Sequence, residues 1–470
     1  MEHKVAWEKY SDAQLEELNA LSSRYIDFIS NNKTERRCFA AAVAQAEAAG
    51  YKPLTVALAA GAALKPGDKV WAGVHGKSLI LACIGTEPLE AGLNILGAHI
   101  DSPRLDLKQN PVYESNGFAF LDTHYYGGIK HYQWVTLPLA LHGVVAKTDG
   151  TVVNVNVGDD AGDPVFCVTD LLPHLGNQQM AKKGSEVVEG ESLDVLIGNR
   201  PLVIKDKEDA SDEEKAAAKE PVKAFALKLL EEKYGIKEED FLSAEIEVVP
   251  AGRARELGFD RSMVLGYGQD DRVCAYTSLE AQLAVTAPKK TAVCVLVDKE
   301  EIGSVGATGM ASQFFENTIA EIVELTEGTG ALSLRHCLSA SRMLSSDVSA
   351  GFDPAYASVF EPKNAAYLGK GLVFNKYTGA RGKSGSNDAR AEYVAYVRRV
   401  MDDADVSFQT AELGKVDVGG GGTIAYIPAK YGMDVIDSGV AVLSMHAPWE
   451  ATSKADIYEA YRGYVAFLKA

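Results

Sequence analysis

Apolar residues at helical spacing dominate the first fifty residues. The segment Ser11-Asp-Ala-Gln14 has the pattern of a capping box, and apolar residues follow it three or four positions apart: Leu15, Leu18, Leu21 and Tyr25. An alanine-rich segment over 35–49 then stops at Gly50. The pattern therefore predicts two helices at the start of the chain.

Continuous apolar runs come next. Segments 69–74, 78–84 and 93–99 carry the signals of strands, and the run that begins at Val293 has the length and β-branched content of a strand buried on both faces. From about residue 260 onward, further apolar runs alternate with helical segments. This alternation is typical of a parallel α/β sheet flanked by helices.

Between about 104 and 250 the pattern is different. Segments such as 151–157 alternate between apolar and polar residues, which predicts half-exposed antiparallel strands. The charged stretch 205–215 is typical of a solvated loop, and 222–234 has the pattern of an amphipathic helix that ends at Gly235.

Length and pattern together predict the domain organisation. A chain of 470 residues is longer than one ordinary core requires. We expect a discontinuous α/β domain, 1–103 and 251–470, with a mixed, largely parallel sheet. A β-rich domain, 104–250, is inserted into it.

Composition narrows the possible partners and compartment. The net charge of −18 argues against nucleic acid and anionic membranes, because both bind cationic surfaces. The six cysteines include no CxxC pair, so they indicate neither a zinc ribbon nor a disulfide framework. Without an apolar leader or a run approaching the roughly 18 residues of a membrane span, the cytoplasm is the expected location.

Polar side chains follow three of the apolar runs. His99 and Asp101 end one run, Asp298 to Glu301 follow a second, and His446 follows the run 439–445. In open α/β sheets, ligands bind outside the carboxyl ends of the strands. The acidic turns 268–272 and 345–348 are candidates for the same edge.

This combination of side chains predicts a metal site. Two imidazoles among several carboxylates suit Zn²⁺, Co²⁺ or Mn²⁺. Asp101 lies two residues from His99, so its carboxylate can orient a ligating imidazole through the other ring N–H. Of the adjacent glutamates, one is expected to bind metal and the other to move a proton.

Simpler interpretations exist for each motif alone. Single histidines are usually structural, and Glu300 with Glu301 could simply be carboxylates at a helix N-terminus. The glycines 419–422 could cradle a phosphate, but no Lys-Ser/Thr follows them as in a P-loop. The joint placement of the motifs favours the metal site.

The same residues resemble the ordered motifs of the aspartyl aminopeptidase and vacuolar aminopeptidase I family, which consists of dinuclear-metal exopeptidases. The motifs are Gly97-Ala-His-Ile-Asp-Ser-Pro-Arg104, Gly268-Gln-Asp-Asp-Arg272, Asp298-Lys-Glu-Glu-Ile-Gly-Ser304, Ser345-Ser-Asp347 and Ser444-Met-His-Ala447. The resemblance runs from the N-terminal helices to the C-terminus and includes the insert. It implies a zinc exopeptidase-like fold and an aminopeptidase that acts on peptides with a free N-terminus.

The resemblance also implies roles for individual residues. It implies two divalent ions per subunit, zinc first and cobalt or manganese as alternatives, with these ligands: His99, Asp270, Glu301, Asp347 and His446. His99 and Asp347 would hold one ion, Glu301 and His446 the other, and Asp270 would bridge them. Glu300 would be the general base toward the metal-activated water, and Asp101 would support His99.

The resemblance also indicates residues of the substrate cleft. The family lines its cleft with backbone groups where this chain has Gly421, Gly422 and Thr423. Where the animal enzymes place a lysine in the pocket for the first residue, this chain has Asn375, with Lys376 adjacent. Acidic and broader neutral specificities both remain open.

Family members are dodecamers built from dimers, and the inserted domain makes the dimer contacts. The segment Asp170-Leu-Leu-Pro-His-Leu175 resembles the piece that reaches into a neighbouring active site, so His174 is a candidate oxyanion donor in trans. The animal enzymes carry a second histidine four residues on, where this chain has Gln178. The alternative for the insert is a lid over its own cleft.

Two other classes of function are compatible with these motifs. One is a different dinuclear metallohydrolase, such as a deacylase or a phosphoesterase. The other is a scaffold that keeps the fold and has lost its chemistry. A scaffold predicts a broken ligand set, whereas all five ligand positions are filled here.

Overall fold

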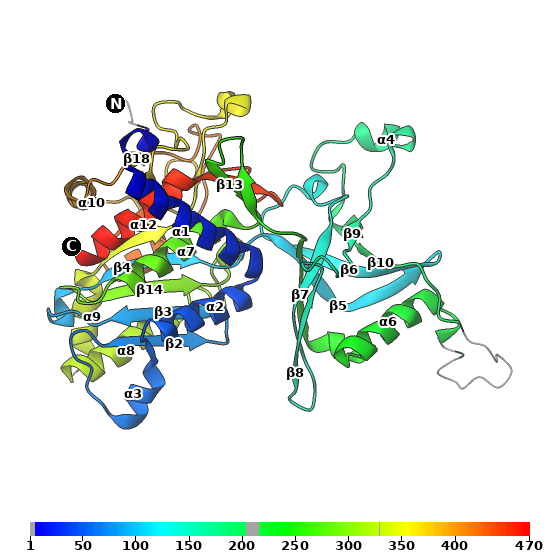
Figure 1. Ribbon diagram of the computed structural model, residues 1–470, viewed down its shortest axis with the longest axis horizontal. Coiled ribbons are helices and arrows are strands. Elements are labelled where there is room, and N and C mark those ends of the chain that lie inside the picture. The colour runs from blue at the N-terminus through cyan, green and yellow to red at the C-terminus, as the bar shows by residue number, and fades with distance from the viewer. Residues whose placement is uncertain (1–4, 204–214, 216, 329) are drawn as a thin grey trace. The chain divides into compact units, whose positions relative to one another are not determined.

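The computed structural model describes residues 5–203, 215, 217–328 and 330–470 (Figure 1). These residues form two compact units. The first comprises the described parts of Met1–Ser102, Ala254–Met445 and Trp449–Ala470, and the second those of Pro103–Arg253 and His446–Pro448. The loop predicted over 205–215 lies, apart from Lys215, outside the described residues.

A nine-stranded mixed sheet is the centre of the first unit. Its strands, in spatial order, are β1 (Lys52–Pro53), β2 (Lys69–Val74), β3 (Ser78–Cys83), β14 (Ala292–Val297), β4 (Asn94–His99), β15 (Arg342–Ser346), β19 (Asp434–Gly439), β17 (Leu372–Asn375) and β18 (Phe408–Thr410). The central strands β14, β4, β15 and β19 run parallel to one another. The strands β2–β3, β3–β14 and β19–β17 pair antiparallel, so the predicted mixed, largely parallel sheet is confirmed.

Helices cover both faces of this sheet (Figure 1). One face carries α1 (Asp12–Asn31), α2 (Glu35–Ala48), α7 (Gln269–Ala284), α10 (Ala391–Asp403) and α12 (Lys454–Lys469). The other carries α3 (Leu54–Ala60), α8 (Phe314–Glu327), α9 (Ala331–Ala340) and α11 (Tyr426–Ala429). On β4, Leu96 and Ala98 pack into the first core and Ile95 into the second, which explains the continuous apolar runs.

The N-terminal helices form as the spacing predicts. The Gln14 N–H donates to Ser11 Oγ at 3.3 Å, and the Ser11 N–H donates to Gln14 Oε1 at 3.0 Å, which completes the capping box of α1. Leu18, Leu21 and Tyr25 are buried on one face of this helix. Both predicted N-terminal helices are confirmed.

A smaller sheet of the first unit corrects one prediction. It contains β12 (Arg255–Leu257), β13 (Met263–Gly266), β21 (Glu450–Ser453), β20 (Ala441–Leu443) and β16 (Ser349–Ala350). The apolar run 439–445, expected to be one strand of the main sheet, instead divides between β19 and β20. A Cβ at Gly439 would lie 1.9 Å from the Asp347 carbonyl oxygen, so a glycine is needed where the chain passes from one sheet to the other.

The second unit contains a seven-stranded antiparallel sheet. Its strands, in spatial order, are β8 (Val152–Val157), β7 (Leu139–Ala146), β11 (Ala244–Pro250), β5 (Arg104–Ser115), β6 (Phe118–Tyr126), β10 (Val195–Gly198) and β9 (Cys167–Val168). The predicted helix is α6 (Pro221–Tyr234), which ends at the left-handed Gly235. The predicted alternation appears in the edge strand β8, where Val155 and Val157 are buried.

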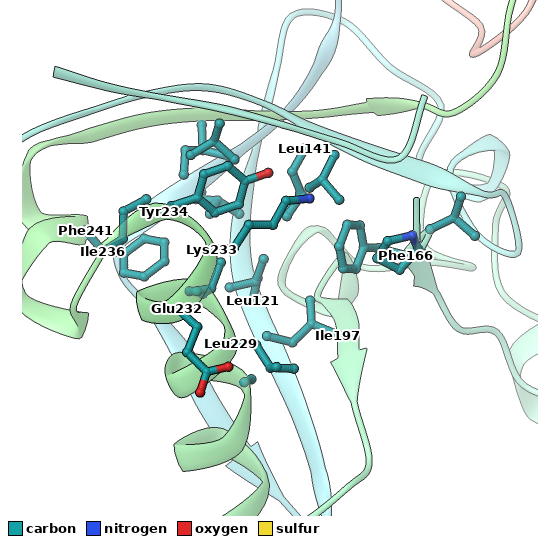
Figure 2. Close-up of a pocket in the computed structure, with 18 residues that line it drawn as sticks. Leu121, Leu141, Phe166, Ile197, Leu229, Glu232, Lys233, Tyr234, Ile236 and Phe241 are labelled. Atoms are coloured by element: carbon teal, nitrogen blue, oxygen red, sulfur yellow. The ribbon is translucent and has the colours of Figure 1, made fainter. Parts of the chain in front are cut away.

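A cavity of about 550 Å³ lies between α6 and this sheet (Figure 2). Its lining is mostly apolar, with Leu121 and Leu141 from the sheet and Leu229 from α6. Glu232 and Lys233 are the charged residues of the lining. Because this lining holds no histidine and one carboxylate, the cavity does not resemble the predicted metal site. Among the described residues, no helix combines the length and apolar character needed to cross a membrane.

Candidate metal centre

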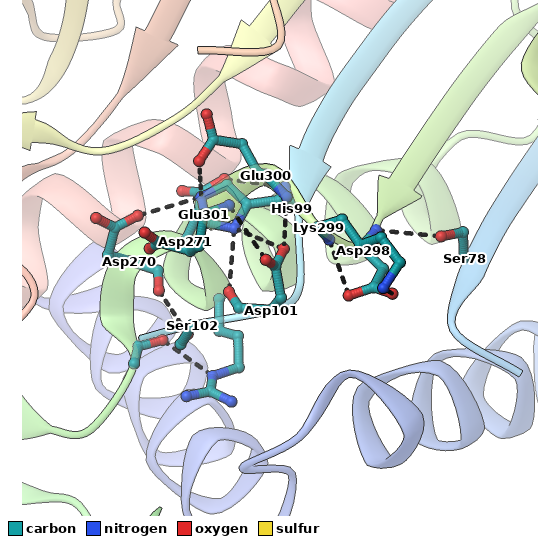
Figure 3. A network of polar contacts seen from close by, with 12 residues as sticks. Ser78, His99, Asp101, Ser102, Asp270, Asp271, Asp298, Lys299, Glu300 and Glu301 are labelled. Carbon is teal, nitrogen blue, oxygen red and sulfur yellow. Dashed lines mark hydrogen bonds and ion pairs between the residues drawn. The ribbon is translucent and has the colours of Figure 1, made fainter. Parts of the chain in front are cut away.

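Three parallel strands deliver the candidate ligands to one edge of the nine-stranded sheet. His99 is the last residue of β4, Glu300 and Glu301 follow β14, and Asp347 follows β15. β14 and β15 are the two neighbours of β4, and His99 is the register partner of Val297. The carboxyl ends of these strands therefore bring residues that are far apart in sequence to one place (Figure 3).

Two overlapping groups of side chains can hold a metal ion there. One consists of His99, Glu300 and Asp347, and the other of His99, Asp270 and Glu301. Within each group, the candidate ligand atoms all lie within 4.8 Å of one another. His99 belongs to both groups, with its Nε2 3.2 Å from Asp270 Oδ1 and 3.9 Å from Glu300 Oε2.

Asp101 connects the imidazole to the two glutamates. His99 Nδ1 lies 3.0 Å from the Asp101 carbonyl oxygen and 3.3 Å from Asp101 Oδ1, and both are acceptors. Nδ1 therefore carries the proton, which leaves Nε2 free to bind metal. The Glu300 and Glu301 N–H groups donate to the same carboxylate, each at 3.2 Å (Figure 3). Asp101 thus holds the start of the short 3₁₀ helix η7 (Glu300–Ile302) against His99.

Backbone contacts hold Asp270 at the start of α7. Its N–H donates to Glu450 Oε2 at 3.1 Å, and its carbonyl accepts from Ser102 Oγ at 2.6 Å. The neighbouring Asp271 is fully buried, and its Oδ2 accepts the His99 backbone N–H at 3.3 Å. The sequence placed both acids in one candidate turn, but the different contacts of the two carboxylates depend on the tertiary structure.

The electrostatics of the site suit a cation. Burial disfavours the charged form of His99, but hydrogen bonds to Asp101 and Asp270 outweigh this and raise its pKa well above the ordinary value. Burial, followed by the charge of Asp271, raises the pKa of Asp347. Clustered, buried carboxylates are costly without a positive partner. An imidazole nitrogen and carboxylate oxygens are donors that zinc accepts, so the residues fit this metal.

The two remaining candidate histidines belong to the second unit. His446 Nδ1 lies 2.8 Å from the Gly128 carbonyl oxygen. Neither metal-binding group found among the described residues includes His446. His174 is exposed in the 3₁₀ helix η4 (Pro173–Leu175).

The candidate substrate residues differ in environment. Asn375 is buried at the end of β17, where its Oδ1 accepts from Ser349 Oγ at 3.3 Å. Lys376 is exposed, with Nζ 3.8 Å from Asp388 Oδ1. Near the glycines, the Gly421 carbonyl accepts from the Gly379 N–H at 2.8 Å, while Gly422 is exposed.

Thr423 contacts a residue that the sequence analysis missed. Its Oγ1 donates to Asp437 Oδ1 at 2.5 Å. Asp437 is buried within β19. An aspartate directly after the apolar pair Val435 and Ile436 was the signal that could have pointed to it.

Comparison with known proteins identifies the family. The family model described as aminopeptidase I zinc metalloprotease (M18) matches residues 28–468. The chain belongs to this family. The resemblance inferred from the five motifs is therefore confirmed.

Individual M18 proteins match over the whole chain. A probable M18 family aminopeptidase 1 of Clostridium acetobutylicum is 62% identical over 467 residues, which cover 99% of this chain and 98% of the relative. The crystal structure of an M18 aminopeptidase from Thermotoga maritima superposes with a TM-score of 0.92 at 44% identity, and covers 100% of this chain and 99% of that one. The S. cerevisiae mApe1 dodecamer shares the fold, with a TM-score of 0.74 at 18% identity over 95% of this chain and 96% of that one.

Membership in the M18 family establishes the general activity. The protein is an aminopeptidase, a zinc metalloprotease that hydrolyses peptides from the N-terminus. The scaffold without chemistry and the unrelated metallohydrolases are therefore the weaker alternatives.

Proposed function

We propose that the chain removes the first residue of peptides with two divalent ions, zinc in the first place, and with Glu300 as the general base. The proposed ligands are His99, Asp270, Glu301, Asp347 and His446. The observation that carries this proposal is that four carboxylates in two overlapping ligand groups surround His99 Nε2. This nitrogen can bind one ion, and the carboxylates provide enough oxygen ligands for a second. His446 is included among the proposed ligands on the family resemblance alone.

The proposed mechanism assigns proton transfer to Glu300. Bound divalent ions would supply Lewis-acid chemistry, lowering the pKa of a water molecule and polarising the scissile carbonyl. The Glu300 carboxylate is about 15% exposed and lies 3.9 Å from His99 at Oε2, within reach of a water at the cluster. It would take the proton of that water and deliver it to the leaving amine. The Asp101 carboxylate would keep Glu300 in place by accepting a hydrogen bond from the Glu300 backbone N–H.

The requirement for a free N-terminus gives the direct test of this function. Aminoacyl p-nitroanilides with free and with acetylated α-amines should be compared, together with a bis(p-nitrophenyl) phosphate control. We expect hydrolysis of the free-amine substrates only. Equal hydrolysis of the acetylated compounds would indicate a deacylase-like or endopeptidase activity, and hydrolysis of the phosphate diester a phosphoesterase.

We also propose that the chain assembles into a dodecamer built from dimers, with the second unit forming the dimer contacts. The support is the fold shared with the S. cerevisiae mApe1 dodecamer and the family resemblance of the insert. We propose the cytoplasm as the location, because all six cysteines are free, as is usual in a reducing compartment.

Shared active sites within this assembly lead to a complementation prediction. His174→Ala and Glu300→Gln should each be inactive or nearly so, since loss of an oxyanion donor costs roughly 10²-fold or more in kcat. When the two variants exchange subunits, some sites should combine Glu300 of one subunit with the partner's His174, and activity should return. Gln178→Ala, four residues after His174, is the matched control and should stay active alone. Mixed oligomers without recovered activity would return His174 to a structural or cis role.

A further inference from the structure

A row of small and polar residues crosses the nine-stranded sheet just before the metal cluster. Gly97 on β4, Ser345 on β15, Asp437 on β19 and Asn375 on β17 are register partners from strand to strand. Partners in neighbouring strands point to the same face, and His99 lies two residues beyond Gly97 on that face. The row is therefore buried, and it lies on the face of the sheet that also carries His99.

Asp437 is the acid of this row. It is 3% exposed, and its Oδ1 accepts from Thr423 Oγ1. Its Oδ2 is buried and has no hydrogen-bond donor among the residues that the structure describes. A buried carboxylate oxygen without a donor is unfavourable, so this oxygen is suited to a donor that arrives with a ligand.

Asp437 is also affected by the charge of Glu300, the proposed general base. Burial raises the pKa of Asp437 to about 7, and the nearby charge of Glu300 adds to the increase. Asp437 and Glu300 are therefore close enough to influence each other's charge. A substrate group placed between these two carboxylates would experience a negative electrostatic potential.

None of the four residues in this row is a cation. Asn375 is neutral and accepts from Ser349. The nearest lysine in sequence, Lys376, is 51% exposed at its side chain and lies beside Asp388. Nothing in the row thus offers a positive partner to a carboxylate.

We propose that Asp437 sets the preference for the first residue of the substrate, by rejecting acidic side chains and accepting neutral or cationic ones over this row. The inference rests on the proposed aminopeptidase function and adds a substrate class to it. A glutamate side chain over the row would meet the Asp437 carboxylate with no compensating cation. A glutamine or lysine side chain would instead offer an N–H to Oδ2.

The glutamyl and glutaminyl p-nitroanilides provide the test, because they have nearly the same shape and differ in charge. At pH 8.5, above the pKa of Asp437, the wild type should cleave the glutaminyl substrate with a kcat/KM at least roughly tenfold higher. Asp437→Asn should reduce this ratio by roughly tenfold, because asparagine still accepts from Thr423 but carries no charge. A lysyl substrate should lose kcat/KM in the same variant.

The matched control is Asp434→Asn, which makes the same change in the same strand. Asp434 pairs with Arg390 at the other end of β19, so its loss should leave the ratio unchanged. Thermal unfolding should accompany each measurement to show that the variants are folded.

Several outcomes would overturn the proposal. Equal cleavage of the glutamyl and glutaminyl substrates by the wild type would overturn it. This result does not depend on whether Asp437→Asn folds. A loss of glutamyl activity alone in Lys376→Gln would assign the preference to that lysine instead. If no free-amine substrate is cleaved by the metal-loaded wild type, it is the proposed function that fails, so the two failures are distinguishable.

Discussion

Glu300→Gln is expected to lower kcat by roughly 10²- to 10⁴-fold, the usual contribution of a general base, while the protein keeps its metal ions. Glutamine retains the size of the side chain but cannot accept the proton of the attacking water. The backbone contact from the Glu300 N–H to Asp101 does not involve the changed side chain, so the turn should keep its position.

Metal content and kinetics should be measured on the same Glu300→Gln sample. The matched control is Glu301→Gln, one residue further on, which should lose one ion because Glu301 is the proposed ligand. Metal content separates the two possible roles of Glu300, because Glu300 itself belongs to one of the two ligand groups. If Glu300→Gln loses an ion, Glu300 binds metal. If kcat stays near normal, another group is the base.

His99→Ala is expected to remove the ion that His99 and Asp347 would hold, and with it all measurable aminopeptidase activity. His99 is the one residue common to the two ligand groups, and its replacement leaves clustered carboxylates without the imidazole. In the wild type, chelators should abolish activity, and added Zn²⁺, Co²⁺ or Mn²⁺ should restore it to different extents. In His99→Ala, the same additions should restore nothing.

His336→Ala is the control for that result. His336 is 61% exposed at its side chain and 3.8 Å from Glu90, so metal content and activity should be unaffected. Retention of both ions by His99→Ala would contradict the assignment of His99 as a ligand.

Much of the architecture could be predicted from local sequence. The capping box of α1 and the glycine that ends α6 follow from contacts among neighbouring residues, and the alternation of β8 follows from the burial of one face of the strand. The buried strands β4 and β14 were visible as apolar runs because helices cover both of their faces. His99, Glu300 and Glu301 stood out since polar groups directly follow such runs.

Other features depend on long-range contacts, which no local pattern encodes. The passage from β19 to β20 follows from the close approach of Asp347 to Gly439, which no periodicity reveals. Because of this passage, His446 does not follow a strand of the main sheet, as its apolar run had suggested.

The sequence by itself determined the helices, the buried strands and the types of residue at the site. Only the tertiary structure decided which of these residues lie in contact with one another. The order β14–β4–β15 places His99 between its acidic neighbours, and Asp101 reaches the amides of Glu300 and Glu301 across about two hundred residues of chain. Asp437 acquires its contact with Thr423 in the same way. The physical reason is that hydrogen bonding and burial act through space, so a polar side chain gains its role from partners that folding brings to it.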